Sequence, residues 1–300
     1  MFDLDSEATC KQIEAFIRQQ VANFQRDGAI VGLSGGVDSA VTAALCVRSL
    51  GVDRVFGVTM TERDSDPRTG PDARLVAEWL GIGTMDRDLT PMLRRLGIYR
   101  WVPPAFPFPR GMRERYARRT HRRLTERLSG PPFAKGLSGS SDATLRRTMA
   151  YVHSKHRLRM VVLYTYAELR NLLVVGTSNR TEWLIGFFVQ YGDGAADIMP
   201  LQGLYKTQVR ALAAYLKVPQ RIVVKAPSPD LAPGLTDEDV IGVPYERLDR
   251  ILVLLERRRS PEEVSEHLGI EQKEVMYAAE LMAKSEYLRR APIALEEGIS

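Results

Sequence analysis

Short apolar runs alternate with amphipathic stretches along most of the chain, a pattern typical of an α/β protein. The apolar runs that predict buried strands are residues 29–33, 54–60 and 172–175, and residues 84–89 predict a further strand with a weaker pattern. The stretches that predict helices are residues 8–24, 40–46, 71–80 and 144–170. Strands that alternate with helices form a parallel sheet, whose ligands bind at the carboxyl ends of the strands. We therefore expect a doubly wound parallel sheet with its site at that edge.

The periodicity stops at residues 97–145, which are rich in proline and arginine. A region of this length without a clear element is usually a lid, a dimer arm or partly disordered. Its arginines, concentrated in residues 110–123, either form a solvated helix face or contact an anionic ligand or partner, and the sequence leaves both alternatives open. We interpret the region as an insertion in an α/β domain of residues 1–245.

A C-terminal helical segment, residues 246–300, follows this domain. Within it, residues 260–276 resemble a helix-turn-helix. Glu271, Glu274 and Glu280 would oppose the phosphates of DNA, however. We therefore interpret this part as a dimer-side or lid helical pair.

The composition excludes several classes of protein. Of the 300 residues, 44% are hydrophobic and 26% are charged, which is ordinary for a globular chain. The N-terminal sequence is acidic, unlike a signal peptide, and no apolar stretch reaches the roughly 18 residues of a membrane span, so we expect a cytoplasmic protein with no membrane partner. The two cysteines, Cys10 and Cys46, predict neither a disulfide framework nor a cysteine zinc site. The net charge of +5 suits a phosphate-rich ligand and equally suits weak nucleic-acid contact.

The most informative turn lies between residues 29–33 and the helix near residue 40. It consists of Ser34, Gly35, Gly36, Val37, Asp38 and Ser39. Two glycines let the backbone approach a phosphate, and the following helix start supplies unpaired N–H groups and a positive dipole. The hydroxyls of Ser34 and Ser39 can donate to phosphate oxygens, whereas the Asp38 carboxylate is expected to hold Mg²⁺. The alternative is that Asp38 or Ser39 merely caps the helix.

This hexapeptide resembles the SGGxDS pyrophosphate loop of the N-type ATP pyrophosphatases, enzymes that form an adenylate and release pyrophosphate. It is not a Walker A loop, because the lysine of that motif is missing here. The resemblance implies a Rossmann-like sheet of the adenine nucleotide alpha-hydrolase kind, with ATP as a substrate. It does not identify the acceptor of the adenylyl group.

Further motifs after the last apolar run narrow the resemblance. They occupy residues 176–182, 186–197 and 204–210. Taken singly, Glu182 could cap a helix, Asp193 and Asp197 could be turn residues, and Lys206 could lie on a surface helix. Together with the SGGVDS loop, they resemble the ammonia-dependent NAD synthetases over most of the chain outside residues 97–145.

That resemblance implies a role for each candidate site residue. The residues that would bind ATP are Ser34, Gly35, Gly36, Val37, Asp38, Ser39, Thr177, Lys206 and Ser228. The residues that would face the acceptor, deamido-NAD, are Arg157, Gln190, Asp197, Tyr287 and Leu288. Asp38 and Glu182 would hold Mg²⁺. The residues that would act in catalysis are Asp38, Lys206 and Asp193.

The implied reaction has two steps. A carboxylate of the acceptor attacks the α-phosphorus of ATP, and ammonia then displaces AMP from the acyl adenylate. Lys206 would be the cation that stabilises charge on the phosphates, and no side-chain nucleophile is needed. The synthetase-like region and its insertion use up the chain, so free ammonia or a separate glutaminase is expected to supply nitrogen. A homodimer is implied by the resemblance and by apolar helix faces near residues 149–167.

Three departures from the family pattern lie on the acceptor side. The family has a lysine where Gln190 stands and a His-Lys pair that falls on Tyr287 and Leu288, and His153 replaces an asparagine. Arg289 or the inserted arginines could supply the missing charge. The departures predict tight ATP binding with weak or absent deamido-NAD turnover.

Two alternative functions therefore stay open beside the leading hypothesis of an NAD synthase. The first is a paralogue that adenylates and amidates another carboxylate in a specialised pathway. The second is a tRNA-modifying or nucleic-acid-binding protein. The second is less favoured, because thiolation enzymes generally need cysteines that are missing near these motifs.

Overall fold

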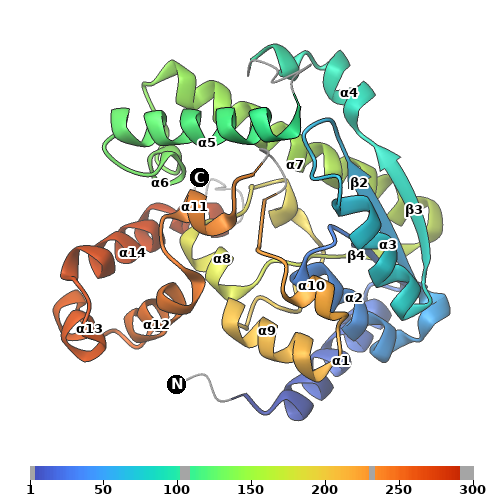
Figure 1. The fold of residues 1–300 in the computed structure, drawn as a ribbon. Helices are drawn as coiled ribbons and strands as arrows, with labels where there is room; N and C mark the ends of the chain where they lie inside the picture. The colour runs from blue at the N-terminus through green and yellow to red at the C-terminus, as the bar shows by residue number, and fades with distance from the viewer. Residues whose placement is uncertain (1–3, 102–108, 230–233, 291–300) are drawn as a thin grey trace, which may run out of the picture.

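The structure is a computed structural model that describes residues 4–101, 109–229 and 234–290 (Figure 1). Its centre is a four-stranded sheet in the order β3-β2-β1-β4. The strands are β1 (Gly28–Gly32), β2 (Val55–Thr61), β3 (Gly83–Asp88) and β4 (Leu172–Val175). All three neighbouring pairs are parallel. The expected α/β fold is confirmed, and the chain changes direction across the sheet between β1 and β4, where such folds bind ligands.

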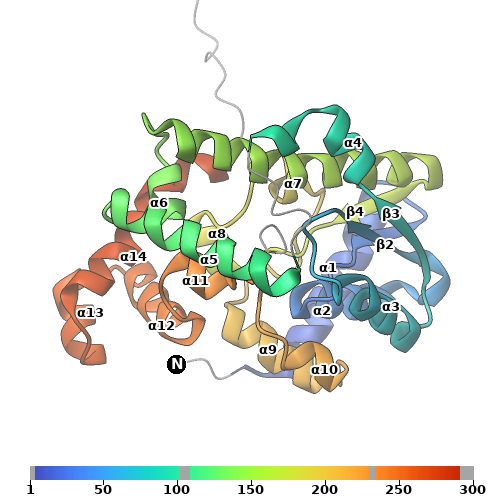
Figure 2. The same ribbon diagram turned by 45° about the horizontal axis from the view of Figure 1, so that its top comes forward.

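Successive side chains of the inner strands enter two different cores, because neighbouring residues of a strand point to opposite faces. On one face, Val31 joins an apolar cluster with helices α1 (Ser6–Asn23), α2 (Val37–Leu50), α3 (Thr69–Leu80) and α9 (Lys206–Tyr215). On the other face, Ile30 packs with α4 (Thr90–Arg95) and the long α7 (Ala143–Arg170). Helices therefore cover both faces, as a doubly wound sheet requires (Figures 1 and 2).

A third apolar cluster holds the C-terminal helices together. Its helices are α6 (Pro132–Gly136), α8 (Arg180–Ile185), α11 (Asp237–Ile241), α12 (Tyr245–Glu256), α13 (Pro261–Leu268) and α14 (Gln272–Lys284). Helices α13 and α14 form the expected pair around Gly269, and both pack against α12. That this pair serves as a dimer side or a lid stays a prediction.

The expectation that residues 97–145 lack a clear element was wrong. They contain the 18-residue helix α5 (Arg110–Arg127), helix α6 and the start of α7. Of the residues of α5 only Leu124 is buried, so the helix shows no apolar periodicity. Its arginines, glutamates and alanine are nevertheless good helix formers. The prolines of this region at positions 103, 104 and 107 lie outside the described residues.

The remaining elements are short. They are α10 (Gln220–Val223) and the 3₁₀ turns Val52–Arg54, Ile98–Arg100, Asp193–Ala195 and Glu286–Arg289. Within the described ranges, we find no helix with the length and apolar character that crossing a bilayer requires.

Candidate active site

The SGGVDS turn joins the carboxyl end of β1 to α2 and is fixed by its own hydrogen bonds. Gly35 has a φ of +66°, and a Cβ there would lie 2.6 Å from Asp72 Cβ, so this position requires glycine. The Gly36 amide donates to Ser34 Oγ at 3.2 Å, and the buried Ser39 hydroxyl donates to the Gly36 carbonyl at 3.0 Å. The turn is therefore preformed for an anion, and the Ser39 hydroxyl shapes it.

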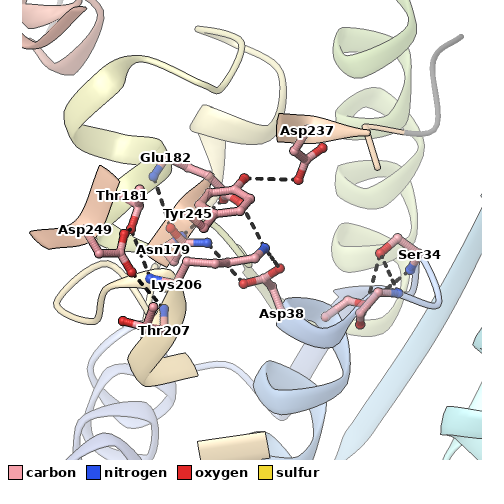
Figure 3. A network of polar contacts seen from close by, with 12 residues as sticks. Ser34, Asp38, Asn179, Thr181, Glu182, Lys206, Thr207, Asp237, Tyr245 and Asp249 are labelled. Atoms are coloured by element: carbon pink, nitrogen blue, oxygen red, sulfur yellow. Dashed lines mark hydrogen bonds and ion pairs between the residues drawn. The ribbon is translucent and has the colours of Figure 1, made fainter. Parts of the chain in front are cut away.

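Lys206 brings the two halves of the site together. It begins α9, and only 1% of its surface is exposed. Its Nζ donates to Asp38 Oδ2 and lies 3.3 Å from Glu182 Oε1 (Figure 3). Asp38 follows β1 and Glu182 follows β4, so the contact links the carboxyl ends of both strands. Although burial opposes the charge, Asp38 and Glu182 raise the pKa of Lys206 above its usual range, which keeps it cationic.

The backbone of Lys206 is held by residues that the sequence analysis missed. The Lys206 amide donates to Thr181 Oγ1 at 3.0 Å, and the Thr181 hydroxyl donates to Asp249 Oδ1 at 2.5 Å. Asp249 also accepts from the Thr207 amide at 2.9 Å, which caps the start of α9. Because Asp249 lies on α12, far along the chain, no local signal in the sequence indicates this role.

Glu182 caps its helix and also faces the buried lysine, whereas its role as a Mg²⁺ ligand stays a prediction. It forms a capping box with Asn179, whose side chain accepts from the Glu182 amide at 3.0 Å. Its other carboxylate oxygen faces Lys206. Asn179 Nδ2 in turn donates to Asp38 Oδ1 at 3.1 Å, which orients that carboxylate. Asn179 is a further site residue that the sequence analysis missed, because it was read only as part of the motif.

A third carboxylate, Asp237, approaches the same lysine. Asp237 Oδ2 accepts from the Tyr245 hydroxyl at 3.0 Å, whereas the buried Oδ1 has no hydrogen-bond partner among the described residues. Burial raises the pKa of Asp237 to about 6 and also raises that of Glu182. The local sequence of Asp237 resembles an ordinary helix cap, because Thr236 and Asp239 on either side of it form a capping box.

The excess of carboxylates fits a divalent cation. One buried ammonium faces three carboxylates, so an added Mg²⁺ would balance the charge. In the described part of the chain, no group of three or more His, Cys, Asp and Glu side chains is placed to hold a metal. Mg²⁺ in nucleotide enzymes is typically held by one or two carboxylates together with substrate phosphates. Asp38 and Glu182 therefore fit as Mg²⁺ ligands only in company with ATP.

Replacing Asp237 with asparagine is expected to stabilise the protein. Because burial raises the pKa of Asp237, its charge destabilises the folded protein above pH 6. Below pH 4 the carboxyl is protonated in both the folded and the unfolded protein, so it has no such effect. At pH 8 the gain should reach about 3 kcal/mol, vanishing near pH 4. Chemical denaturation at both pH values measures it. The exposed Asp239→Asn on the same helix is the control, and equal effects of the two changes would contradict the argument.

A cavity of about 990 Å³ opens over the turn and the lysine. Its wall includes every predicted ATP-binding and acceptor-binding residue except Gly35 and Asp197. Gly35 packs against Asp72 of α3, and Asp197 accepts from the Val174 amide and the Tyr164 hydroxyl, both at 2.8 Å. Asp197 therefore fastens the end of β4 to α7 in this structure.

Two of the predicted acceptor residues, Arg157 and Gln190, lie together on the wall. Arg157 Nε donates to the Gln190 carbonyl at 3.3 Å, and Asp193 Oδ1 lies 3.2 Å from His156 Nδ1. Although burial opposes it, His156 and nearby N–H groups lower the pKa of Asp193, which keeps this carboxylate ionised. The Tyr287 hydroxyl donates to a backbone carbonyl of the C-terminal cluster at 2.8 Å.

A second buried charge cluster fixes the loop after β2. Lys155, fully buried on α7, places its Nζ 2.7 Å from Glu62 Oε1 and 2.9 Å from Asp64 Oδ2. The hydroxyls of Tyr99 and Tyr151 donate to the same two carboxylates. Asp64 and Tyr151 line the cavity, so the cluster sets the shape of its wall. The sequence analysis missed it, because α7 was predicted from apolar spacing alone.

A preformed anion turn after β1 and a buried lysine that joins the carboxylates following β1 and β4 are typical of an adenylate-forming nucleotide enzyme of the ATP-pyrophosphatase kind. The NAD synthase family model matches residues 9–98 and 133–292. The chain therefore belongs to the NAD synthase family, whose enzymes are ATP-dependent ligases. The gap in the match, residues 99–132, contains α5 and most of the expected insertion.

Similar proteins support this assignment. The NH(3)-dependent NAD(+) synthetase of Thermotoga neapolitana is 44% identical over 94% of both chains, and that of Methanocaldococcus jannaschii is 37% identical over 95% of both. Among solved structures, an NMN synthetase from Francisella tularensis has a TM-score of 0.72 at 26% identity. The NH3-dependent NAD synthetase of Campylobacter jejuni has a TM-score of 0.69 at 25% identity. Each of these two comparisons covers 98% of this chain and 100% of the other.

Proposed function

We propose that the protein is an ammonia-dependent NAD synthetase, which converts deamido-NAD, ATP and ammonia into NAD, AMP and pyrophosphate. One observation carries the proposal: Lys206 contacts Asp38 of the phosphate turn and Glu182 across the switch point of the sheet. The near full-length similarity to relatives with this name supports the choice of reaction.

The site residues would act at different steps of the reaction. The turn at Ser34 would hold the phosphates, and Lys206 would stabilise negative charge as the bond between the α- and β-phosphates breaks. The acceptor carboxylate oxygen forms the new bond to the α-phosphorus, and pyrophosphate leaves. Ammonia then forms the bond to the acyl carbon, AMP leaves, and the proton goes to solvent. Mg²⁺ bound with ATP at Asp38 and Glu182 would supply neutralisation of phosphate charge.

One assay tests the proposal directly. Purified protein is incubated with ATP, Mg²⁺, ammonium and deamido-NAD, and NAD and AMP are measured. We expect equal amounts of the two products. ATP consumption without NAD formation would contradict the acceptor assignment, and absence of AMP would contradict the adenylate.

A second acceptor is favoured by one comparison. The structure from Francisella tularensis, with its TM-score of 0.72, is called an NMN synthetase. The neutral side chains at Gln190, Tyr287 and Leu288, which line the cavity here, are where the sequence predicted altered acceptor recognition. The ratio of kcat/KM for deamido-NAD and for nicotinate mononucleotide decides between a dinucleotide and a mononucleotide acceptor. Poor use of both would favour a different carboxylate.

The nitrogen donor is expected to be free ammonia or ammonia from a separate glutaminase. The relatives that this chain covers almost completely carry the NH(3)-dependent name. Rates with ammonium and with glutamine at equal concentration measure the preference. A rate with glutamine that equals the rate with ammonium would overturn this prediction.

Assembly and location remain proposals. We propose a homodimer, on the basis of the family and of apolar side chains on α7, where Val161 is 61% and Leu169 74% exposed. Light scattering at working concentration should give twice the mass of the chain, and a monomer would contradict it. A cytoplasmic location stays a prediction from the N-terminal sequence.

A further inference from the structure

One face of α5 forms part of the cavity wall, although the family match leaves this helix out. The residues of α5 that line the cavity are Arg113, Tyr116, Ala117, Thr120, His121, Arg123, Leu124 and Arg127. They recur three or four positions apart, which is the spacing of a single helix face. Arg115 and Arg119 are exposed and do not line the cavity. The helix therefore has one face toward the cavity and one toward solvent; the exposed arginines form a solvated face, and contact of the others with an anionic ligand stays a prediction.

Three contacts fasten α5 over the cavity. Arg110 Nη2 lies 2.7 Å from Asp66 Oδ2, in the loop between β2 and α3. Arg118 Nε donates to the Gly234 carbonyl at 3.0 Å, and Arg127 lies 2.9 Å from Asp142 Oδ2 at the start of α7. In Figures 1 and 2 the helix extends from the end of β2, where its N-terminus lies, toward α6 and the C-terminal helices. It bridges the two sides of the site.

The N-terminal end of α5 lies on the phosphate side. Its anchor, Asp66, is in the loop that leads into α3, and α3 residues Thr69 and Asp72 contact Gly35 of the phosphate turn. Arg68 of this loop and Thr69 at the start of α3 line the cavity together with Ser34 and Gly36. Arg113 lies one helical turn beyond Arg110, on the cavity face.

Arg113 differs from the arginines that anchor the helix. Its Nε is buried and has no hydrogen-bond partner among the described residues, whereas Arg110, Arg118 and Arg127 all have oxygen partners. A second buried nitrogen without a partner on this face is His121 Nε2. A buried N–H donor without an acceptor is unfavourable, and a bound phosphate oxygen would remove that penalty. The planar guanidinium also matches phosphate oxygens in pairs.

We propose that Arg113 binds the β- and γ-phosphates of ATP from the side opposite the SGGVDS turn, and holds the pyrophosphate as it leaves. The proposal rests on the placement of the ATP phosphates at that turn. It makes α5 a working part of the nucleotide site rather than a surface insertion. Arg113 becomes a phosphate-binding residue that lies outside the family match.

Ligand binding to matched variants tests the proposal. Calorimetry with Mg-ATP, Mg-pyrophosphate and AMP is carried out on the wild type, Arg113→Ala, Arg113→Lys and the control Arg119→Ala. Loss of a charge-assisted contact should weaken Mg-ATP and pyrophosphate binding by about 10- to 100-fold, with AMP unaffected. Arg113→Lys should recover part of the loss, and Arg119→Ala should bind like the wild type. In turnover, the KM for ATP should rise while the KM for the acceptor stays unchanged.

Three results would contradict the proposal that Arg113 holds the phosphates. If Arg113→Ala binds Mg-ATP and pyrophosphate normally, or if Arg119→Ala loses as much, Arg113 does not hold the phosphates. A rise confined to the acceptor KM would assign Arg113 to the acceptor instead. If Arg113→Ala does not fold, Arg113→Gln carries the same test. Because binding requires no turnover, Arg113-dependent ATP binding without NAD formation would contradict the proposed function and leave this inference standing.

Discussion

Replacing Lys206 with alanine should both abolish activity and lower the free energy of unfolding. The change removes the only cation in contact with Asp38 and Glu182 among the described residues and leaves buried carboxylates unpaired. Breaking a buried ion pair by removing one partner costs about 3–5 kcal/mol. Removing a preorganised charge from the reacting phosphates costs roughly 10²- to 10³-fold in kcat. Chemical denaturation and steady-state kinetics measure the two losses separately.

Arg210→Ala provides the control on the same helix. Arg210 lies 3.0 Å from the exposed Glu246, and such surface pairs contribute about 0–1 kcal/mol. The control should keep both stability and turnover near those of the wild type. A Lys206→Ala protein with native stability and more than a tenth of wild-type turnover would show that Lys206 is neither a structural nor a catalytic cation.

The inner strands and β4 could be predicted because parallel strands buried on both faces appear as continuous apolar runs, whereas β3 is largely polar and has no buried residue. β4 is buried at all four positions, and its predicted bounds of 172–175 agree with the structure. Helix α5 could not be predicted in this way, since it is almost entirely polar and is held by ion pairs at its ends. Apolar periodicity detects burial, and an element that lines a polar cavity buries little apolar surface.

Individual residues of the network around Lys206 were predictable, but the network was not. Asp38 and Glu182 lie in short motifs that follow β1 and β4, and Lys206 lies in a motif that was assigned from the family resemblance. Asp249 and Asp237 were not predicted, because their local sequence resembles ordinary helix surface and helix cap. What places them in the site is packing of the C-terminal helices against α8 and α9. Long-range contacts of this kind leave no trace in local spacing.

The charge balance predicts that removing Lys206 and removing one of its carboxylate partners change the stability of the protein in opposite directions. With Asp38, Glu182 and Asp237 ionised, one cation faces three anions, so removing an anion relieves repulsion. Because burial raises the pKa of Glu182, its charge destabilises the folded state above the ordinary glutamate pKa. Neutralising one of these carboxylates should therefore leave the stability at pH 8 unchanged or raise it. Lys206→Ala should lower the stability at the same pH.

Asp38→Asn and Glu182→Gln should accordingly lose activity without losing the fold. Each change removes a carboxylate that fits as an Mg²⁺ ligand, and we expect at least about a 100-fold fall in kcat. Glutamine at position 182 can still complete the capping box with Asn179, so that variant removes the charge and keeps the helix start. Turnover is measured against Mg²⁺ concentration, and unfolding at pH 8 and pH 4. If either variant kept near wild-type turnover with normal Mg²⁺ dependence, the replaced residue would not be a metal ligand. If both variants were as unstable as Lys206→Ala, the argument from charge balance would be wrong.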